Sequence, residues 1–250
     1  MTKTCLFVAC VLLGARAVSP AAGAEFAEAD DRPVRLFILA GQSNMVHVKP
    51  AESFTPIVER AFPDARVVVV KDAHSGNLVR MWHKAWQTPE GAQRRGRGRN
   101  GKRYDQLMDK VRPALAELPQ PISVSFVWMQ GEADTRFASY AAIYDKALKG
   151  ILEQLQKDLD RKDIDFVVGR ISDYGNDKPK QRPGWMTVRE TQVKFAEAKP
   201  SRTWVNTDDL NGDHDGLHLT KEGYKKLGER FAEAAVRLVN REEEPAEDEQ

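Results

Sequence analysis

Cysteine is almost missing from this chain of 250 residues, and its two examples, Cys5 and Cys10, lie in one apolar stretch near the N-terminus. Lys3 precedes that stretch and Ala22-Gly23-Ala24 follows it, which is the pattern of a secretory signal peptide cut after Ala24. The sequence therefore predicts a signal peptide over residues 1–24 and a mature chain without cysteine. Such a chain has no disulfide and no thiol nucleophile.

A hydrophobic run that could cross a membrane is missing as well. The apolar stretch, residues 5–14, falls well short of the roughly 20 residues that a transmembrane helix needs. Arg16 interrupts its end and leaves a cytoplasmic location open as an alternative. We expect a secreted or periplasmic protein with no membrane span.

An excess of charge of either sign is the third absence. Cleavage after Ala24 removes Lys3 and Arg16 and no acidic residue, so 38 basic residues become 36 against 37 acidic ones. No overall field attracts nucleic acid, and we expect no nucleic-acid partner. The dense basic segment, residues 94–103, is predicted to be a flexible, solvated loop; contact with an anionic polysaccharide or nucleic acid is the alternative.

The C-terminal residues 241–250 are an acidic run without large apolar side chains, and such a composition predicts a disordered tail. Between the signal peptide and the tail, residues 25–240 have the length of one domain with a sizeable core.

Five runs rich in β-branched and aromatic residues alternate with helical patterns in this domain. The strand-like runs are residues 34–40, 65–71, 122–129, 164–171 and 203–206. The clearest helical stripe covers residues 140–155, and the last covers 224–238 with Thr220 as its N-cap. This alternation predicts an α/β fold with a mostly parallel sheet and helices on both of its faces.

A polar motif follows four of the predicted strands. Ser43 stands in Gly41-Gln42-Ser43-Asn44 after the first strand, Gly76 follows the second, Gln130 the third, and Asp215-Gly216-Leu217-His218 the last. Because parallel strands end at one edge of a sheet, we expect these motifs to converge there. Polar turns also follow strands for ordinary backbone reasons, so each motif alone decides nothing.

Serine, histidine and aspartate in this arrangement indicate nucleophilic catalysis. Asp215 can hold one nitrogen of the His218 ring and leave the other to take a proton from Ser43. A surface histidine near a helix start is the alternative for His218.

Taken in order, the four motifs, with Trp128-Met129-Gln130-Gly131-Glu132-Ala133-Asp134 around the third, resemble the conserved blocks of SGNH hydrolases. The branch that this sequence resembles is that of sialate O-acetylesterase-like and acetylxylan-esterase-like proteins, carbohydrate esterase family six. The resemblance implies a three-layer αβα, flavodoxin-like fold. It also implies an oxyanion hole made of the backbone N–H groups of Ser43 and Gly76 and the side-chain amide of Gln130.

Several other residues allow more than one interpretation. Glu132 with Asp134 could be the carboxylate pair of a glycosidase, but no second acidic motif accompanies them, so we interpret Glu132 as a structural or substrate-orienting residue. Trp82 is predicted to stack on a sugar in the cleft, whereas Trp128 is predicted to lie in the core.

The acidic and histidine residues near the C-terminal motif could instead form a metal site; they are Asp209, Asp213, His214, Asp215 and His218. Gly212 and Gly216 oppose a helix that would place both histidines on one face. We expect neither a metal nor another cofactor.

The sequence thus predicts an extracytoplasmic serine esterase that removes O-acetyl groups from a carbohydrate. The alternatives are a short-chain carboxylesterase, thioesterase or lipase-like hydrolase, and a non-catalytic glycan-binding module on the same fold.

Overall fold

The computed structural model describes residues 30–212 and 214–243. The described residues from Arg32 onward form one compact unit. The first unit, Met1–Asp31, lies almost wholly outside the described residues, and so does the predicted signal peptide. None of the described helices has the length and the apolar character that a membrane span requires.

Five parallel strands in the described part of the chain form one sheet in the order β2-β1-β3-β4-β5. They are β1 (Val34–Gly41), β2 (Arg66–Ala73), β3 (Ser123–Met129), β4 (Ile164–Gly169) and β5 (Arg202–Val205). The three central strands are buried along their whole length, which explains their nearly continuous apolar sequences. All five predicted strands are confirmed, with ends that differ by one or two residues.

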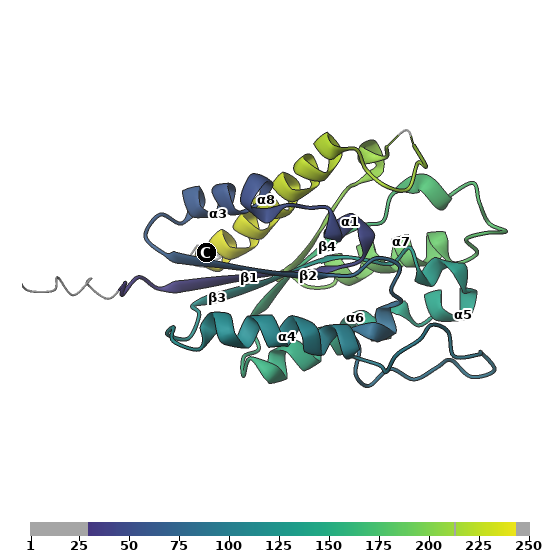
Figure 1. Ribbon diagram of the computed structural model, residues 1–250, viewed down its shortest axis with the longest axis horizontal. Helices are drawn as coiled ribbons and strands as arrows, with labels where there is room; N and C mark the ends of the chain where they lie inside the picture. Colours follow the sequence, from purple (N-terminus) through teal and green to yellow (C-terminus); the bar gives the residue numbers. More distant parts are fainter. Residues whose placement is uncertain (1–29, 213, 244–250) are drawn as a thin grey trace, which may run out of the picture. The chain divides into compact units, whose positions relative to one another are not determined.

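Helices cover both faces of the sheet, so the predicted three-layer α/β fold is confirmed. The α-helices are α1 (Ser43–Val46), α2 (Pro50–Ser53), α3 (Thr55–Ala61), α4 (Lys102–Leu115), α5 (Ala138–Ala141), α6 (Tyr144–Asp158), α7 (Trp185–Glu197) and α8 (Lys221–Glu243). Figure 1 shows α3 and α8 over one face and α4 and α6 over the other. Short 3₁₀ turns follow the strands: η1 (Val79–Met81), η2 (Asp134–Arg136), η3 (Asp173–Gly175) and η4 (Asp208–Leu210).

Two helix predictions need adjustment and one is confirmed. The stripe over residues 140–155 is divided between α5 and α6, because Ile143 leaves the helical conformation with φ −118° and ψ 16°. The N-cap at Thr220 is confirmed, since its hydroxyl accepts the Gly223 N–H at 3.0 Å.

Helix α8 continues to Glu243, so residues 241–243 of the predicted disordered tail are helical. Arg and Glu favour a helix, and the strong amphipathic run before them is already helical. Residues 244–250 lie outside the described residues.

Candidate active site

The backbone at the end of β1 is compressed against β3. Gly41 has φ +150°, and a Cβ at this position would lie 1.9 Å from the Met129 carbonyl oxygen, so only glycine fits. The next N–H, that of Gln42, donates to the same carbonyl at 2.8 Å. This close approach ends the strand and starts α1 with Ser43, whose side chain is largely buried.

Helix α1 is held at its C-terminal end by a lysine from the neighbouring strand β2. The Lys71 ammonium group donates to the carbonyl oxygens of Met45, Val46 and Val48 at 3.3, 2.8 and 2.5 Å. Carbonyls at a helix end have no partner within the helix, and a cation there is favourable. Burial lowers the pKa of Lys71, and the nearby Lys110 lowers it further. The position of Ser43 therefore depends on β2 as well as on β1.

His218 and Asp215 form a hydrogen-bonded pair in the loop before α8. His218 Nδ1 lies 2.6 Å from Asp215 Oδ2, and Asp215 Oδ1 accepts the backbone N–H groups of Leu217 and His218 at 2.9 and 2.7 Å. Partial burial raises the pKa of Asp215, but these hydrogen bonds outweigh it and bring the pKa to about 2. Asp215 is therefore ionised at neutral pH. It orients the imidazole ring and leaves Nε2 for other chemistry.

Asn44, the residue after Ser43, joins three segments that are far apart in the sequence. Its Nδ2 donates to Glu132 Oε1 at 2.9 Å and to the Leu217 carbonyl oxygen at 3.3 Å. Its Oδ1 accepts the Tyr224 hydroxyl at 3.2 Å. The segment of Ser43, the turn after β3 and the loop of His218 therefore meet at the carboxyl edge of the sheet, where we expected the motifs to lie.

Glu132 is buried and acts in the structure as an acceptor for Asn44. Burial raises the pKa of this carboxyl group, although the hydrogen bond from Asn44 and the charge of His218 lower it. This hydrogen bond joins the turn after β3 to the segment that follows Ser43. Direct contact with a substrate stays a prediction.

Gly76 precedes Asn77 in the chain, and the side chain of Gln130 binds the Asn77 carbonyl group. Gly76 is exposed in a left-handed conformation with φ +67°. The Gln130 amide is fully buried; its Nε2 donates to the Asn77 carbonyl at 3.0 Å and to Asp134 Oδ2 at 2.5 Å, and its Oε1 accepts the Tyr144 hydroxyl at 2.8 Å. Both amide protons thus already have acceptors. Gln130 fixes the Gly76 loop to β3, and a part in the oxyanion hole stays a prediction for both residues.

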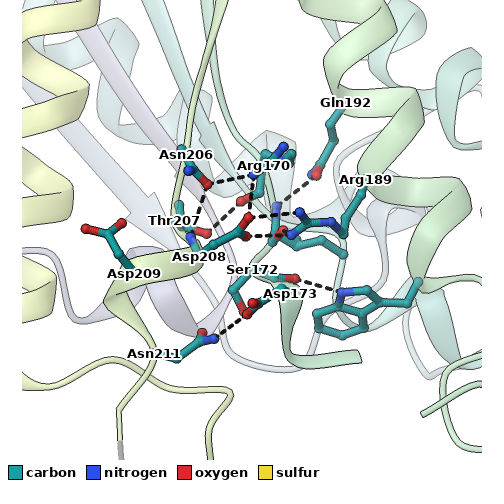
Figure 2. A network of polar contacts seen from close by, with 12 residues as sticks. Arg170, Ser172, Asp173, Arg189, Gln192, Asn206, Thr207, Asp208, Asp209 and Asn211 are labelled. Atoms are coloured by element: carbon teal, nitrogen blue, oxygen red, sulfur yellow. Dashed lines mark hydrogen bonds and ion pairs between the residues drawn. The ribbon is translucent and has the colours of Figure 1, made fainter. Parts of the chain in front are cut away.

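A polar network fixes the chain that leads from β5 toward Asp215 (Figure 2). Asp208 accepts hydrogen bonds from both terminal nitrogens of Arg189, a residue of α7, at 2.7 and 3.1 Å. It accepts another from Arg170 at 2.6 Å. Arg170 also donates to Asn206 Oδ1 at 2.7 Å, and its carbonyl accepts the Thr207 hydroxyl at 2.7 Å. The paired Arg189 lowers the pKa of Asp208. The ends of β4 and β5 are therefore tied together where the loop of His218 departs.

The model of the carbohydrate esterases described as sialic acid-specific acetylesterases matches residues 46–237. The chain belongs to this family. The predicted family and enzyme class, a carbohydrate esterase that hydrolyses carboxylic esters, are therefore confirmed, and the non-catalytic alternative is not retained. The matched span begins after Ser43 and includes Gly76, Gln130, Asp215 and His218.

Solved structures similar to this esterase support the fold. A protein from Arabidopsis thaliana is 18% identical, with a TM-score of 0.63 over 82% of this chain and 98% of its own. A carbohydrate acetylesterase from Xanthomonas citri is 16% identical, with a TM-score of 0.55 over 82% of this chain and 56% of its own. Est24, a carbohydrate acetylesterase from Sinorhizobium meliloti, is 13% identical, with a TM-score of 0.53 over 82% of this chain and 99% of its own. The comparison with curated proteins by sequence found no match.

The predicted sugar contact of Trp82 in this esterase is wrong. Its side chain is 0% exposed and packs edge-on against Trp128, with ring centroids 5.2 Å apart. A large apolar ring gains more free energy inside the core than at a wet rim, and the turn at η1 directs it inward. The prediction that Trp128 lies in the core is confirmed.

The basic segment 94–103 of the esterase is ordered by Arg80, a residue that no sequence motif marks. The Arg80 side chain is fully buried, and its guanidinium donates to the carbonyl oxygens of Arg95, Arg97 and Gly98 at 2.7, 3.0 and 3.0 Å. It also donates to Asn100 Oδ1 at 3.1 Å. The expectation of a flexible loop is therefore replaced by a loop built around a buried cation. No local pattern marks an arginine 15 residues away as its partner.

Asp209, one of the alternative metal ligands, is already paired in the esterase. It accepts two hydrogen bonds from Arg230, at 2.7 and 2.6 Å, and Lys226 lies 3.4 Å away. Within the described ranges no group of three acidic, histidine or cysteine side chains is arranged to hold an ion. Asp213 lies outside the described residues.

Proposed function

We propose that this esterase removes O-acetyl groups from a carbohydrate by a serine mechanism in which Ser43 is the nucleophile. The observation that carries the proposal is the 2.6 Å contact between His218 and Asp215 in a loop bonded to Asn44, the neighbour of Ser43. The structurally similar proteins from Xanthomonas citri and Sinorhizobium meliloti, both carbohydrate acetylesterases, support the substrate class.

In the proposed mechanism each group has one task. His218 Nε2 removes the proton from the Ser43 hydroxyl as its oxygen attacks the acetyl carbonyl. It then gives that proton to the sugar oxygen as the bond between this oxygen and the acetyl carbon breaks, so the sugar leaves with a free hydroxyl. Asp215 stabilises the positive imidazolium that forms between these two steps. The backbone N–H groups of Ser43 and Gly76 and the Gln130 amide stabilise the oxyanion, and water then hydrolyses the acetyl-enzyme by the same steps. For Gln130 this requires one of the present hydrogen bonds of its Nε2, which go to Gln42, Asn77 and Asp134, to be exchanged.

Location and domain limits belong to the same proposal. Export through a signal peptide cut after Ala24 would place the enzyme outside the cytoplasm, where acetylated polysaccharides are accessible. Residues 25–240 would then be the mature catalytic domain.

Ser43→Ala tests the nucleophile. We expect the variant to fold and to lose about 10⁴-fold or more of its turnover of p-nitrophenyl acetate and of acetate release from acetylated xylan and O-acetyl sialic acid. Ser139→Ala, at an exposed serine of α5, is the matched control and keeps full activity. Near-normal turnover by folded Ser43→Ala refutes the mechanism. Turnover of p-nitrophenyl acetate without acetate release from any acetylated glycan favours a simple short-chain carboxylesterase.

The base is tested with His218→Ala, Asp215→Asn and His214→Ala in the same assays. We expect His218→Ala to lose more activity than Asp215→Asn, because the histidine moves the proton and the aspartate positions it. His214→Ala should behave like the wild type. Loss of activity in His214→Ala together with retention in His218→Ala would show that the base is wrongly assigned.

A further inference from the structure

A pocket of about 430 Å³ opens beside Gly76 and is lined by basic side chains. The lining includes six cationic residues and no acidic one: Arg80, Arg95, Arg97, Lys102, Arg103 and Arg136. They come from η1, the basic loop, the start of α4 and η2. Segments that are remote in sequence thus place positive charge around one cavity, next to the predicted oxyanion hole.

These cations lack carboxylate partners in the part of the chain that the structure describes. Arg103 donates to the neutral acceptors Asn77 Oδ1, at 3.1 Å, and Gln106 Oε1, and Arg95 lies 5.0 Å from the Phe137 ring centroid. Two basic side chains outside the lining behave differently, because both Arg99 and Lys84 pair with Asp105. The cations that line the pocket therefore form no ion pair among the described residues, whereas Arg99 and Lys84 just beyond its wall do.

The pocket wall is preorganised. The carbonyl oxygens that Arg80 binds belong to Arg95 and Arg97, two of the residues that line the cavity. Further hydrogen bonds hold the loop from other sides, from the Arg95 N–H to the Tyr140 hydroxyl at 2.8 Å and from Asn100 Nδ2 to the Trp86 carbonyl at 2.9 Å. Burial lowers the pKa of Arg80, yet arginine stays protonated in proteins. A buried cation whose hydrogen-bond acceptors are all neutral contributes positive potential to the pocket, although the charge of the nearby Asp134 carboxyl group opposes the fall in the pKa of Arg80 and offsets part of this potential.

We propose that this pocket is a subsite for an anionic sugar, bearing a carboxylate or a sulfate group, adjacent to the acetylated sugar in a polysaccharide chain. The inference rests on the proposed esterase function. Arginine side chains bind carboxylate and sulfate oxygens through paired hydrogen bonds. The volume is far larger than one acid group and lies in the range of pockets that enclose a small ligand, so a whole charged sugar ring fits beside Gly76.

The first experiment measures binding without catalysis. Unacetylated oligogalacturonate, a sulfated xylo-oligosaccharide and neutral xylo-oligosaccharide are titrated calorimetrically into wild type and into the double variant Arg97→Gln with Arg136→Gln. We expect at least one acidic ligand to bind the wild type more tightly than the neutral one, and the double variant to lose about tenfold or more of that affinity. The two acidic arms distinguish carboxylate from sulfate. Arg66→Gln, which removes one positive charge at the amino end of β2, outside the pocket lining, is the control and keeps the affinity.

The second experiment measures kcat/KM on acetylated acidic glycans, on acetylated neutral xylo-oligosaccharide and on p-nitrophenyl acetate. The double variant should lose about tenfold on the acidic substrates and keep its rate on the other two, and the unchanged p-nitrophenyl acetate rate verifies its fold. Equal loss on acidic and neutral glycans, or no loss of acidic-ligand affinity, overturns the subsite. Failure of the wild type to hydrolyse any ester refutes the proposed function instead, while the binding result still decides the subsite.

Discussion

Replacement of Asp134 by asparagine tests a buried carboxyl group at the centre of the candidate site. Asp134 is fully buried; its Oδ2 accepts the Val79 N–H at 2.9 Å and the Gln130 amide at 2.5 Å. Its Oδ1 has no hydrogen-bond partner among the described residues. Burial raises the pKa of Asp134 from 3.8 to about 7, although the hydrogen bonds from Gln130 and Val79 oppose the rise. The folded protein therefore keeps the proton to a higher pH than the unfolded chain does.

The sign and size of the effect on stability follow from this difference. The contribution of the carboxyl group to the free energy of unfolding is fully present below pH 4 and is lost as the pH rises through 7. Between these two pH values the group is ionised in the unfolded chain and still protonated in the folded protein, so each rise in pH favours the unfolded chain. A difference of about three pKa units at 1.36 kcal/mol each corresponds to about 4 kcal/mol. Asparagine does not titrate, so the stability of wild type relative to Asp134→Asn should fall by about this amount between pH 4 and pH 8.

Urea unfolding followed by circular dichroism at unit steps from pH 4 to pH 8 measures this difference. Subtraction of the variant's curve removes the contributions of other titrating groups, which both proteins share. Asp209→Asn is the control. Because Arg230 lowers the pKa of Asp209, the contribution of this carboxylate to stability changes with pH only below pH 4, and the difference between wild type and Asp209→Asn stays flat above pH 4. A flat or rising difference between wild type and Asp134→Asn would refute the reasoning.

Two further substitutions test the position of Ser43. Gly41→Ala should lower the free energy of unfolding in urea by about 3 kcal/mol or more, because its Cβ meets the Met129 carbonyl. The control Gly91→Ala, at φ +69° with open space around it, should lower it by only about 1 kcal/mol, and equal losses would contradict the steric argument. Lys71→Met removes three hydrogen bonds to the end of α1 and should lower kcat on p-nitrophenyl acetate about tenfold or more with little change in KM. The exposed Lys146→Met serves as its control, and a wild-type kcat in Lys71→Met would show that α1 is held without this cation.

The sheet was predictable because its signal is local. Runs such as residues 34–40 and 164–171 carry their burial in their own composition, and a parallel sheet collects the ends of its strands at one edge whatever the loops contain. The convergence of the Ser43, Glu132 and His218 segments follows from that topology alone. The hydrogen bond between Asp215 and His218 was predictable for the same reason, since the two residues are three positions apart.

What the sequence did not reveal depends on partners far along the chain. No residue near Trp82 in the sequence indicates that its ring packs against Trp128, so the sequence was equally compatible with a ring that faces a cleft. A run of arginines predicts solvation unless a buried Arg80 is known to bind its carbonyl groups. Lys71 lies within an apolar strand run, and nothing around it in the sequence indicates that its ammonium group binds the carbonyl oxygens at the end of α1.

The hydrogen bonds of Asn44 have a consequence for the order in which the protein becomes active. They join residues separated by 88, 173 and 180 positions, so two of the three close only when the chain through the start of α8 is present. Such distant contacts form late in folding because each requires a long loop to close. A chain still being synthesised holds Ser43 from the start but gains His218 almost at the end. We therefore expect hydrolysis to appear abruptly with the docking of α8, and partial chains to be inert toward esters.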